Sequence, residues 1–138
     1  MPGQLNIVST PIGNLRDITF RAIEVLKSVD LILAEDTRVA QKLLNHYAIE
    51  NKITSFNLVN ENQKTKTVIK KLKEGKNIAL IADAGTPLIS DPGYLLIRSA
   101  REESIQVIPV PGCSAAIAAL TASGIASDKF TFYGFLPK

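Results

Sequence analysis

The chain has 138 residues, a formal net charge of +3 and a sequence pI near 9.1, which permits an anionic partner without requiring one. A chain of this length buries about two thirds of the surface that its unfolded form exposes, so we expect one domain without cross-links. The single cysteine, Cys113, and the single histidine, His46, exclude a disulfide framework and a zinc site of ordinary spacing within one chain. No run reaches the ~18 apolar residues of a membrane span, and no secretory leader is recognisable, so the sequence predicts a soluble cytoplasmic protein.

Short apolar runs alternate with longer amphipathic segments along the whole chain. In order, the pattern predicts strands at 5–9, 30–34, 53–56, 78–82, 106–110 and 129–135. Between them it predicts helices at 22–29, 39–47, 61–74, 92–103 and 113–123. This alternation predicts an α/β fold, a mostly parallel sheet with helices on both faces.

Several predicted helices have recognisable end signals. Asp17 or Thr19 is the expected N-cap of the first helix, and Gly75 is the expected stop of the third. Asp91 is the expected N-cap of the fourth helix, with Pro92 at its first helical position. That fourth start lies directly behind a polar loop, so free backbone N–H groups should be available there for a ligand.

Six lysines lie in or directly after the third predicted helix. They are Lys64, Lys66, Lys70, Lys71, Lys73 and Lys76. The pattern fits either the solvated outer face of an amphipathic helix or a surface for a phosphate backbone. No arginine-rich run or interleaved aromatic residues accompany the lysines, so the sequence favours neither a single-strand stacking platform nor a basic arm.

Polar or glycine-containing segments follow four of the predicted strands, at 10–14, 35–38, 83–91 and 111–116. Ligands of open α/β sheets bind beyond the carboxyl ends of the strands, where these four segments should meet. The segment 83–91 alone contains two carboxylates and two hydroxyl groups. The sequence therefore predicts a small-molecule site at this edge of the sheet.

Several familiar kinds of site are absent. No G-x-G-x-x-G follows the first strand, and Gly75-Lys76 is followed by Asn77 rather than by a serine or threonine, which disfavours dinucleotides and nucleoside triphosphates. No G-x-S-x-G is present, and His46 is expected at the surface of a helix rather than as a catalytic base. Cys113 has no resolving cysteine and no nearby histidine, so we do not expect it to act as a nucleophile.

The small residues from Pro111 to Ala116 allow two interpretations. Small side chains at a helix start let a ligand approach the backbone, and the Ser114 hydroxyl can donate to a carboxylate or a ribose. Equally, the alanines can serve tight packing of the helix against the sheet. The sequence alone leaves both open.

These segments together resemble the tetrapyrrole methylase superfamily of S-adenosylmethionine-dependent methyltransferases. Within it, the chain is similar to the branch that 2′-O-methylates a cytidine ribose of small-subunit (16S) ribosomal RNA. The matching segments are Thr10 to Leu15, Ala34 to Arg38, Asp83 to Tyr94, Pro111-Gly112 with Ser114 to Ala116, and Gly134 to Pro137. The long loop from Asp83 distinguishes this branch from the tetrapyrrole-methylating enzymes, whose loop is shorter.

The resemblance implies S-adenosylmethionine as the methyl donor. It implies donor-binding roles for Pro11, Gly13, Asp83, Ala84, Gly85, Thr86, Pro87, Ile89, Ser114, Ala115 and Ala116. Arg38 and Asn14 are the residues it suggests for contact with the RNA substrate. The implied partner is small-subunit rRNA or the ribosomal subunit, and no metal or membrane is implied.

A ribose 2′-hydroxyl is a poor nucleophile and benefits from a general base within hydrogen-bond reach. Glu35, Asp36 and Asp91 are the carboxylates at the expected edge of the sheet, and the sequence does not choose among them. Asp36 or Asp91 can instead be a helix cap, and Arg38 can pair with either of them or with an RNA phosphate.

The resemblance also bears on domain organisation. Residues 1–138 correspond to the N-terminal domain of the family, whose second domain is missing, and family members are typically homodimers. The sequence ends three residues after the predicted sixth strand, as though another domain should follow. Two alternatives stay open: methylation of a tetrapyrrole or other small molecule, and a binding module without turnover.

Overall fold

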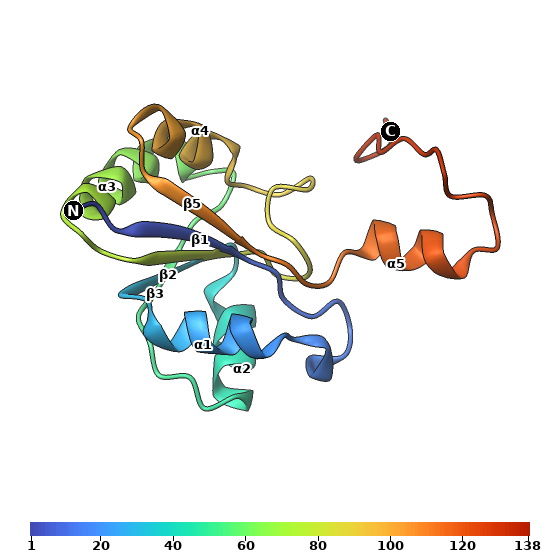
Figure 1. Ribbon diagram of the computed structural model, residues 1–138, viewed down its shortest axis with the longest axis horizontal. Helices are drawn as coiled ribbons and strands as arrows, with labels where there is room; N and C mark the ends of the chain where they lie inside the picture. Colours follow the sequence, from blue (N-terminus) through green and yellow to red (C-terminus); the bar gives the residue numbers. More distant parts are fainter.

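The computed structural model describes all 138 residues, and its centre is one sheet of five parallel strands (Figure 1). The strands are β1 (Gln4–Val8), β2 (Leu31–Ala34), β3 (Ile53–Ser55), β4 (Ile78–Ile81) and β5 (Gln106–Val110), and their order across the sheet is β3-β2-β4-β1-β5. All pairings are parallel, so every strand connects to the next through a crossover. The predicted α/β fold is confirmed.

Five α-helices and one 3₁₀ turn connect and follow the strands. They are η1 (Leu15–Asp17), α1 (Phe20–Ser28), α2 (Thr37–His46), α3 (Glu61–Lys73), α4 (Tyr94–Glu102) and α5 (Ala115–Ala122). Helices α1 and α2 cover one face of the sheet, and α3 and α4 cover the other (Figure 1). Helices on both faces were predicted, and the first four take those places.

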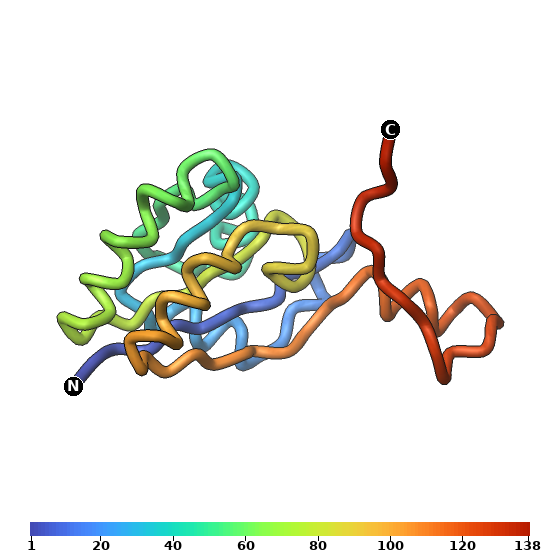
Figure 2. Tube along the Cα trace, turned by 90° about the horizontal axis from the view of Figure 1, so that it is seen from above, coloured from blue at the N-terminus to red at the C-terminus, as the bar shows by residue number.

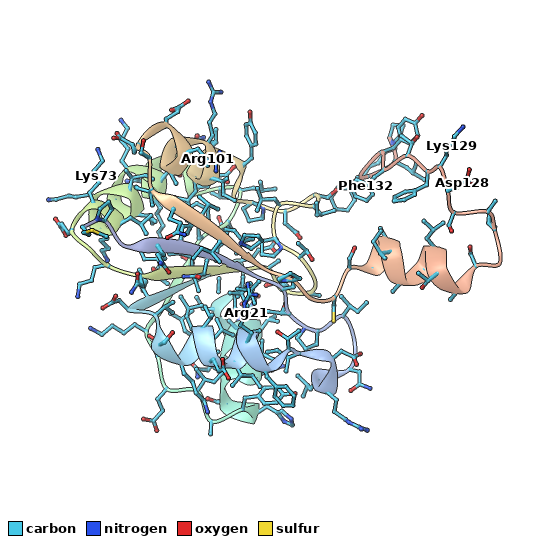
Figure 3. The ribbon with its side chains drawn as sticks, viewed as in Figure 1. Arg21, Lys73, Arg101, Asp128, Lys129 and Phe132 are labelled. Atoms are coloured by element: carbon cyan, nitrogen blue, oxygen red, sulfur yellow. The ribbon has the colours of Figure 1, made fainter.

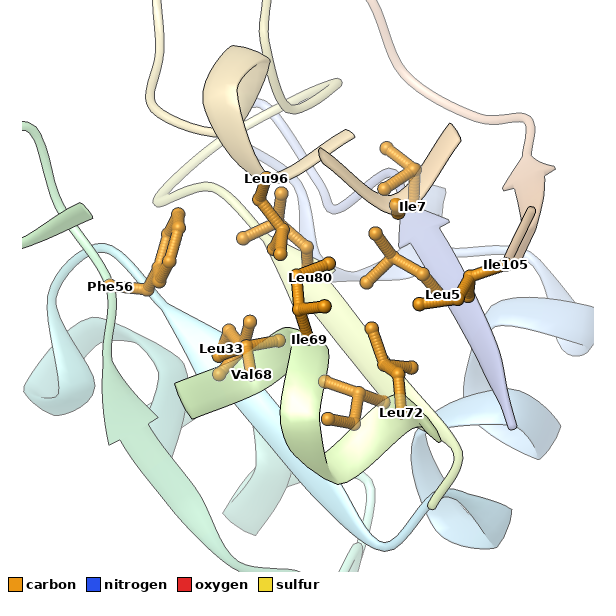
Figure 4. Packing of buried hydrophobic residues seen from close by; sticks show 12 residues of the cluster. Leu5, Ile7, Leu33, Phe56, Val68, Ile69, Leu72, Leu80, Leu96 and Ile105 are labelled. Carbon is orange, nitrogen blue, oxygen red and sulfur yellow. The ribbon is translucent and has the colours of Figure 1, made fainter. Parts of the chain in front are cut away.

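The two faces of the sheet are buried in two separate apolar clusters. Side chains alternate along β4, because successive residues of a strand point to opposite faces. Ile78 and Leu80 enter the cluster beneath α3 and α4, while Ala79 and Ile81 enter the one beneath α1 and α2 (Figure 4 shows the first cluster). Burial on both sides explains why this strand is a continuous apolar run in the sequence.

The predicted sixth strand at 129–135 is wrong. These residues have no regular secondary structure, and no backbone hydrogen bond joins them to the sheet. A strand forms only where a neighbouring strand pairs with its N–H and C=O groups, and apolar alternation alone does not supply that neighbour. The chain instead leaves the end of β5, forms α5 beyond the sheet and turns back (Figures 1 and 2).

The expected cap of α4 is also wrong. The helix begins at Tyr94, its N-cap is Gly93 with φ of +130°, and the Asp91 side chain makes no cap hydrogen bond. Pro92 precedes that cap, so the turn takes two more residues than the sequence suggested. The N–H of Gly93 donates to Glu61 Oε2 of α3 at 3.0 Å, which ties the two helices together. At α1 the alternative is resolved, because Thr19 Oγ1 accepts from the Ala22 N–H at 3.0 Å.

The lysine-rich helix is a solvated surface in which most of the amines have partners. Lys64 Nζ donates to the Ser55 hydroxyl at 2.9 Å, and Lys73 Nζ lies 2.6 Å from Glu103 Oε2 (Figure 3 labels Lys73). Lys76 pairs with Asp30 in the same way, at 3.2 Å. These contacts within the chain favour the solvated-face interpretation. No helix combines the length and the apolar character needed to cross a membrane.

Candidate functional site

The loops after β1 and β4 are joined to each other just beyond the sheet. Thr10 and Gly85 form an antiparallel bridge, with both N–H···O distances equal to 3.0 Å. Gly85 has φ of +80°, and a Cβ atom there would lie 3.3 Å from the Ile12 side chain. A glycine therefore suits this position for both its backbone angle and its close neighbour.

A short chain of hydroxyl groups fastens the turn before α5 to the same place. Thr86 Oγ1 donates to the Cys113 carbonyl at 2.8 Å and lies 2.9 Å from Ser9 Oγ. Because Thr86 has one hydroxyl proton, Ser9 is the donor in the second contact. Gly112 allows the approach, since a Cβ atom there would lie only 2.8 Å from the Ser9 Cβ.

These contacts border an open cavity of about 440 Å³, which we call the main cavity. It is lined by Ile12, Ala84, Gly85, Thr86, Ile89, Ser90, Asp91, Ser114, Ala115, Ala116, Phe132, Gly134 and Phe135. Small-molecule sites are typically ~300–1,000 Å³, mostly apolar, with a few polar groups that orient the ligand. The C-terminal segment after α5 forms one side of the main cavity through Phe132, Gly134 and Phe135 (Figure 3 labels Phe132).

The structure brings together most of the residues predicted to bind the donor. Those in the main cavity are Ala84, Gly85, Thr86, Ile89, Ser114, Ala115 and Ala116, joined by the predicted carboxylate Asp91. Pro11 and Asp83 line a second hollow instead, and Gly13 and Pro87 line neither.

Five lining residues were not singled out from the sequence: Ile12, Ser90, Phe132, Gly134 and Phe135. Ile12, Ser90, Gly134 and Phe135 lie inside the matching segments, so the motifs carried a signal for them. Phe132 lies outside every motif, and its place depends on how the segment after α5 turns back.

The second hollow lies on the other side of the Thr10–Gly85 bridge and has a volume of about 160 Å³. It is lined by Thr10, Pro11, Leu15, Val39, Ala40, Lys42, Leu43, Ile81, Ala82 and Asp83. The Tyr47 hydroxyl donates to the Leu15 carbonyl, which holds η1 against α2 and closes one wall. We call this hollow the α2 slot.

The two residues predicted to contact substrate lie apart from both hollows. Arg38 lines an open polar groove on α2, together with Gln41, Lys42 and Asn45. Asn14 Oδ1 accepts from the Arg16 N–H at 3.0 Å and so caps η1. The groove is open to a polyanion, whereas Asn14 has a local structural contact.

Asp36 is the N-cap of α2. Its Oδ1 accepts from the Arg38 N–H at 2.9 Å, and its Oδ2 lies 2.9 Å from the Arg38 guanidinium. These contacts with Arg38 lower the pKa of Asp36 to about 2, chiefly through the side-chain hydrogen bond. The cap interpretation therefore describes Asp36 in the structure, and a carboxylate held in this way is a weak proton acceptor.

Glu35 and Asp91 have the opposite electrostatic environment. Burial raises the pKa of Glu35, and the charges of Asp83 and Asp91 raise it further. Burial is also the main cause that raises the pKa of Asp91, followed by the charge of Asp83. Asp83 itself is fixed by its Oδ1, which accepts from the Asp36 N–H at 2.9 Å. Raised carboxylate pKa values are typical of groups that exchange protons.

The start of α5 faces the main cavity rather than the sheet. Ala115, Ala116, Ala118 and Ala119 are all exposed, so the tight-packing interpretation of these alanines is wrong for this structure. The Ser114 side chain makes no cap hydrogen bond, which leaves its hydroxyl free. His46 is exposed and contacts only the edge of Tyr47 among the aromatic rings.

Residues 4–136 match the family described as Tetrapyrrole (Corrin/Porphyrin) Methylases. The chain belongs to the tetrapyrrole methylase family. Among solved structures, it is similar to the uroporphyrin-III-C-methyltransferase of Thermus thermophilus, with a TM-score of 0.69 and 23% identity. That match covers 91% of this chain and 55% of the other, and it shows that the tetrapyrrole methylase fold is present here.

Two curated proteins are much closer in sequence to this chain, and both are named ribosomal RNA small subunit methyltransferase I. The protein of Escherichia coli O157:H7 is 58% identical over 98% of this chain and 47% of its own length. The protein of Haemophilus influenzae is 58% identical over 99% of this chain and 48% of its own length. The chain therefore spans about half the length of the curated relatives it matches.

Proposed function

We propose that this chain provides the methyl-donor half of an S-adenosylmethionine-dependent methyltransferase that 2′-O-methylates a cytidine ribose in small-subunit (16S) rRNA. The observation that carries the proposal is the main cavity, which gathers four separate motif segments around one space of about 440 Å³. The identity of 58% to relatives named for small-subunit rRNA methylation supports RNA as the substrate.

The lining of the main cavity suits S-adenosylmethionine. Ile12 and Ile89 supply apolar surface, and the small residues at 84–85 and 115–116 leave backbone groups accessible. The free Ser114 hydroxyl can bond to the hydroxyl or carboxylate groups of the donor. When bound, the donor supplies an electrophilic methyl group on a sulfonium centre.

The acceptor hydroxyl loses a proton as its oxygen takes the methyl group, so the site needs a base. We assign that role to Asp91, because it lines the main cavity and burial raises its pKa. Glu35 does not line the main cavity, and Asp36 is held by Arg38. Arg38 and the groove on α2 are the proposed contacts for the RNA backbone.

The assembly is also a proposal. We infer a cytoplasmic homodimer, as the family resemblance implies. We also infer a second domain that completes the cleft, because the chain matches only 47–48% of the length of these relatives. Exposed apolar side chains beyond Ser114, among them Ile117, Phe132 and Phe135, support burial against another surface. Sedimentation velocity of the chain, alone and extended by the C-terminal half of the H. influenzae relative, tests the oligomeric state.

Calorimetric titration with S-adenosylmethionine tests the donor site. Ala116→Trp places an indole in the main cavity and should abolish saturable binding. Ala118→Trp is the matched control, since Ala118 is exposed on the same helix but does not line the cavity, and it should bind as the unaltered chain does. Equal loss in both variants, or no binding by the folded chain, would count against this donor site.

Activity is tested with the extended chain described above and 16S rRNA that lacks its ribose methylation. Methyl transfer to a cytidine 2′-oxygen is expected, and Asp91→Asn should slow it by about 10²–10⁴-fold while donor binding persists. Methylation of uroporphyrinogen III instead of RNA would support the tetrapyrrole alternative. Donor binding without transfer to either acceptor would support a binding module.

A further inference from the structure

The α2 slot lies beside the main cavity but is not part of it. The Thr10–Gly85 bridge is the wall between them, because Pro11 lines one side and Ile12 the other. Asp83 lies on the slot side of this wall and Asp91 on the cavity side. A ligand group in the slot would therefore lie next to the main cavity but outside it.

The slot is sized for a single ring. Its volume is about 160 Å³, and an apolar cavity of about 150 Å³ is known to accept benzene. Its walls are largely apolar, with Leu15 and Val39 at the open side and the buried Leu43 and Ile81 deeper in. A pyrimidine ring matches this space more closely than the larger double ring of a purine does.

Two charged groups at the slot give it a chemical preference. Asp83 is exposed, and while its Oδ1 accepts from the Asp36 N–H, its Oδ2 has no partner. A carboxylate accepts from the N4 amino group of cytosine and repels the O4 carbonyl that uracil presents at the same place. Lys42 lines both the slot and the polar groove beside it and forms no ion pair, so its amine is available to a phosphate.

We propose that the α2 slot holds the base of the acceptor nucleotide and selects a pyrimidine by size and cytosine by the carboxylate of Asp83. Lys42 then contacts the phosphate of that nucleotide, and the groove with Arg38 continues toward the neighbouring phosphates. The assignment rests on the proposed function, since it takes the acceptor to be RNA. It assigns Asp83 to the acceptor nucleotide, in place of the donor-binding role that the resemblance implied.

The test is an NMR titration of the ¹⁵N-labelled chain with 5′-CMP, 5′-UMP and 5′-AMP. CMP should shift the amides of Val39, Leu43 and Ala82, UMP should bind at least about 5-fold more weakly, and AMP should leave these amides unmoved. Val39→Trp should abolish the CMP response, because this side chain lies at the open side of the slot and is 39% exposed, so a larger group fills the slot without entering the core.

Two charge variants sharpen the test. Lys42→Met should weaken CMP by about 2- to 5-fold, while Lys66→Met, an exposed lysine of α3 away from the slot, should have no effect. Asp83→Asn should remove the preference for CMP over UMP. Equal binding of the three nucleotides, or shifts confined to α3 or to the main cavity, would overturn the proposal.

Binding of S-adenosylmethionine to the same samples tests the proposed function independently of the slot. Val39→Trp should keep its affinity for S-adenosylmethionine, since Val39 does not line the main cavity. Donor binding without a CMP response at the slot refutes the slot and leaves the proposed function standing. A CMP response at the slot without donor binding supports the slot and refutes the donor site.

Discussion

The sheet with its four covering helices and the segment that follows it differ sharply in how they use apolar residues. Every buried residue lies at or before Val110, and residues 113–138, here called the C-terminal arm, contain none. Yet the arm is rich in large apolar side chains, including Ile117, Phe132 and Phe135. Apolar residues of the first region stabilise the fold, whereas those of the arm line the main cavity or remain available to another surface.

The largest expected difference between the two regions is the loss of unfolding free energy when one apolar side chain is truncated in each. Leu80 is fully buried, so Leu80→Ala should lower the free energy of unfolding by about 2–5 kcal/mol. Ile117 is 48% exposed on α5, so Ile117→Ala should change it by no more than about 0.5 kcal/mol. Urea denaturation of both variants measures the difference, and comparable losses would mean that the arm is part of the folded core.

Two glycines with positive φ extend the comparison to the backbone. Gly93 has φ of +130°, and a Cβ atom there would lie 2.8 Å from the Leu80 side chain, so Gly93→Ala should cost about 1–3 kcal/mol. Gly124 has φ of +71° with no atom within 4 Å of such a Cβ, so Gly124→Ala should cost about 1 kcal/mol from backbone strain alone. Thermal unfolding followed by circular dichroism ranks the two, and the reverse order would contradict the crowding at Gly93.

The Thr86 hydroxyl joins the two regions. Thr86→Val removes its bonds to Ser9 and to the Cys113 carbonyl, and about 1 kcal/mol of unfolding free energy should be lost. The amide resonances of Ser114 should shift as well, because the turn before α5 loses its anchor. Thr121→Val is the control, since the Thr121 hydroxyl bonds only to Ala118 of its own helix and the change should be close to zero. Unmoved Ser114 resonances in Thr86→Val would show that the anchor lies elsewhere.

The sequence predicted the first region well for a physical reason. Burial on both faces produces continuous apolar runs such as 78–81, and short loops leave little choice of topology. The arm was predicted poorly, because the alternation at 129–135 gives a strand only if a neighbour pairs with it. Asp91 was misplaced as a cap because Glu61, distant in sequence, takes the N–H of Gly93.

The candidate site shows the same division. Motif residues of the 83–91 loop and of 114–116 converge on the main cavity, because the carboxyl ends of parallel strands share one edge. What the sequence could not separate was which side of the Thr10–Gly85 bridge each residue faces. Asp83 and Asp91 are the same residue type in the same loop. In the structure, Asp83 lines the α2 slot and Asp91 lines the main cavity, with the Thr10–Gly85 bridge between them.

The smallest expected effect is a change in the pKa values of carboxyl groups near the main cavity. The only ionisable side chain in the lining of this cavity, Asp91, comes from the region before the C-terminal arm. The arm contributes no ionisable side chain to its lining, so the electrostatics around Asp91 come from burial and from Asp83. Asp83→Asn should therefore lower the pKa of both Glu35 and Asp91, because each is raised in part by the Asp83 charge. Carboxyl ¹³C shifts followed against pH measure both values in the chain.

The sign for stability follows from the same shifts. A carboxyl whose pKa is raised by folding binds its proton more tightly in the folded state, so it destabilises the fold above that pKa and the penalty disappears as the pH falls through it. Asp83→Asn relieves part of this penalty, so the variant should gain a little stability at pH 7 relative to pH 3. The pKa of Asp36, set by Arg38, should stay at about 2. If the pKa values of Glu35 and Asp91 do not move, the charge of Asp83 does not contribute to them, and burial is the main cause at both sites.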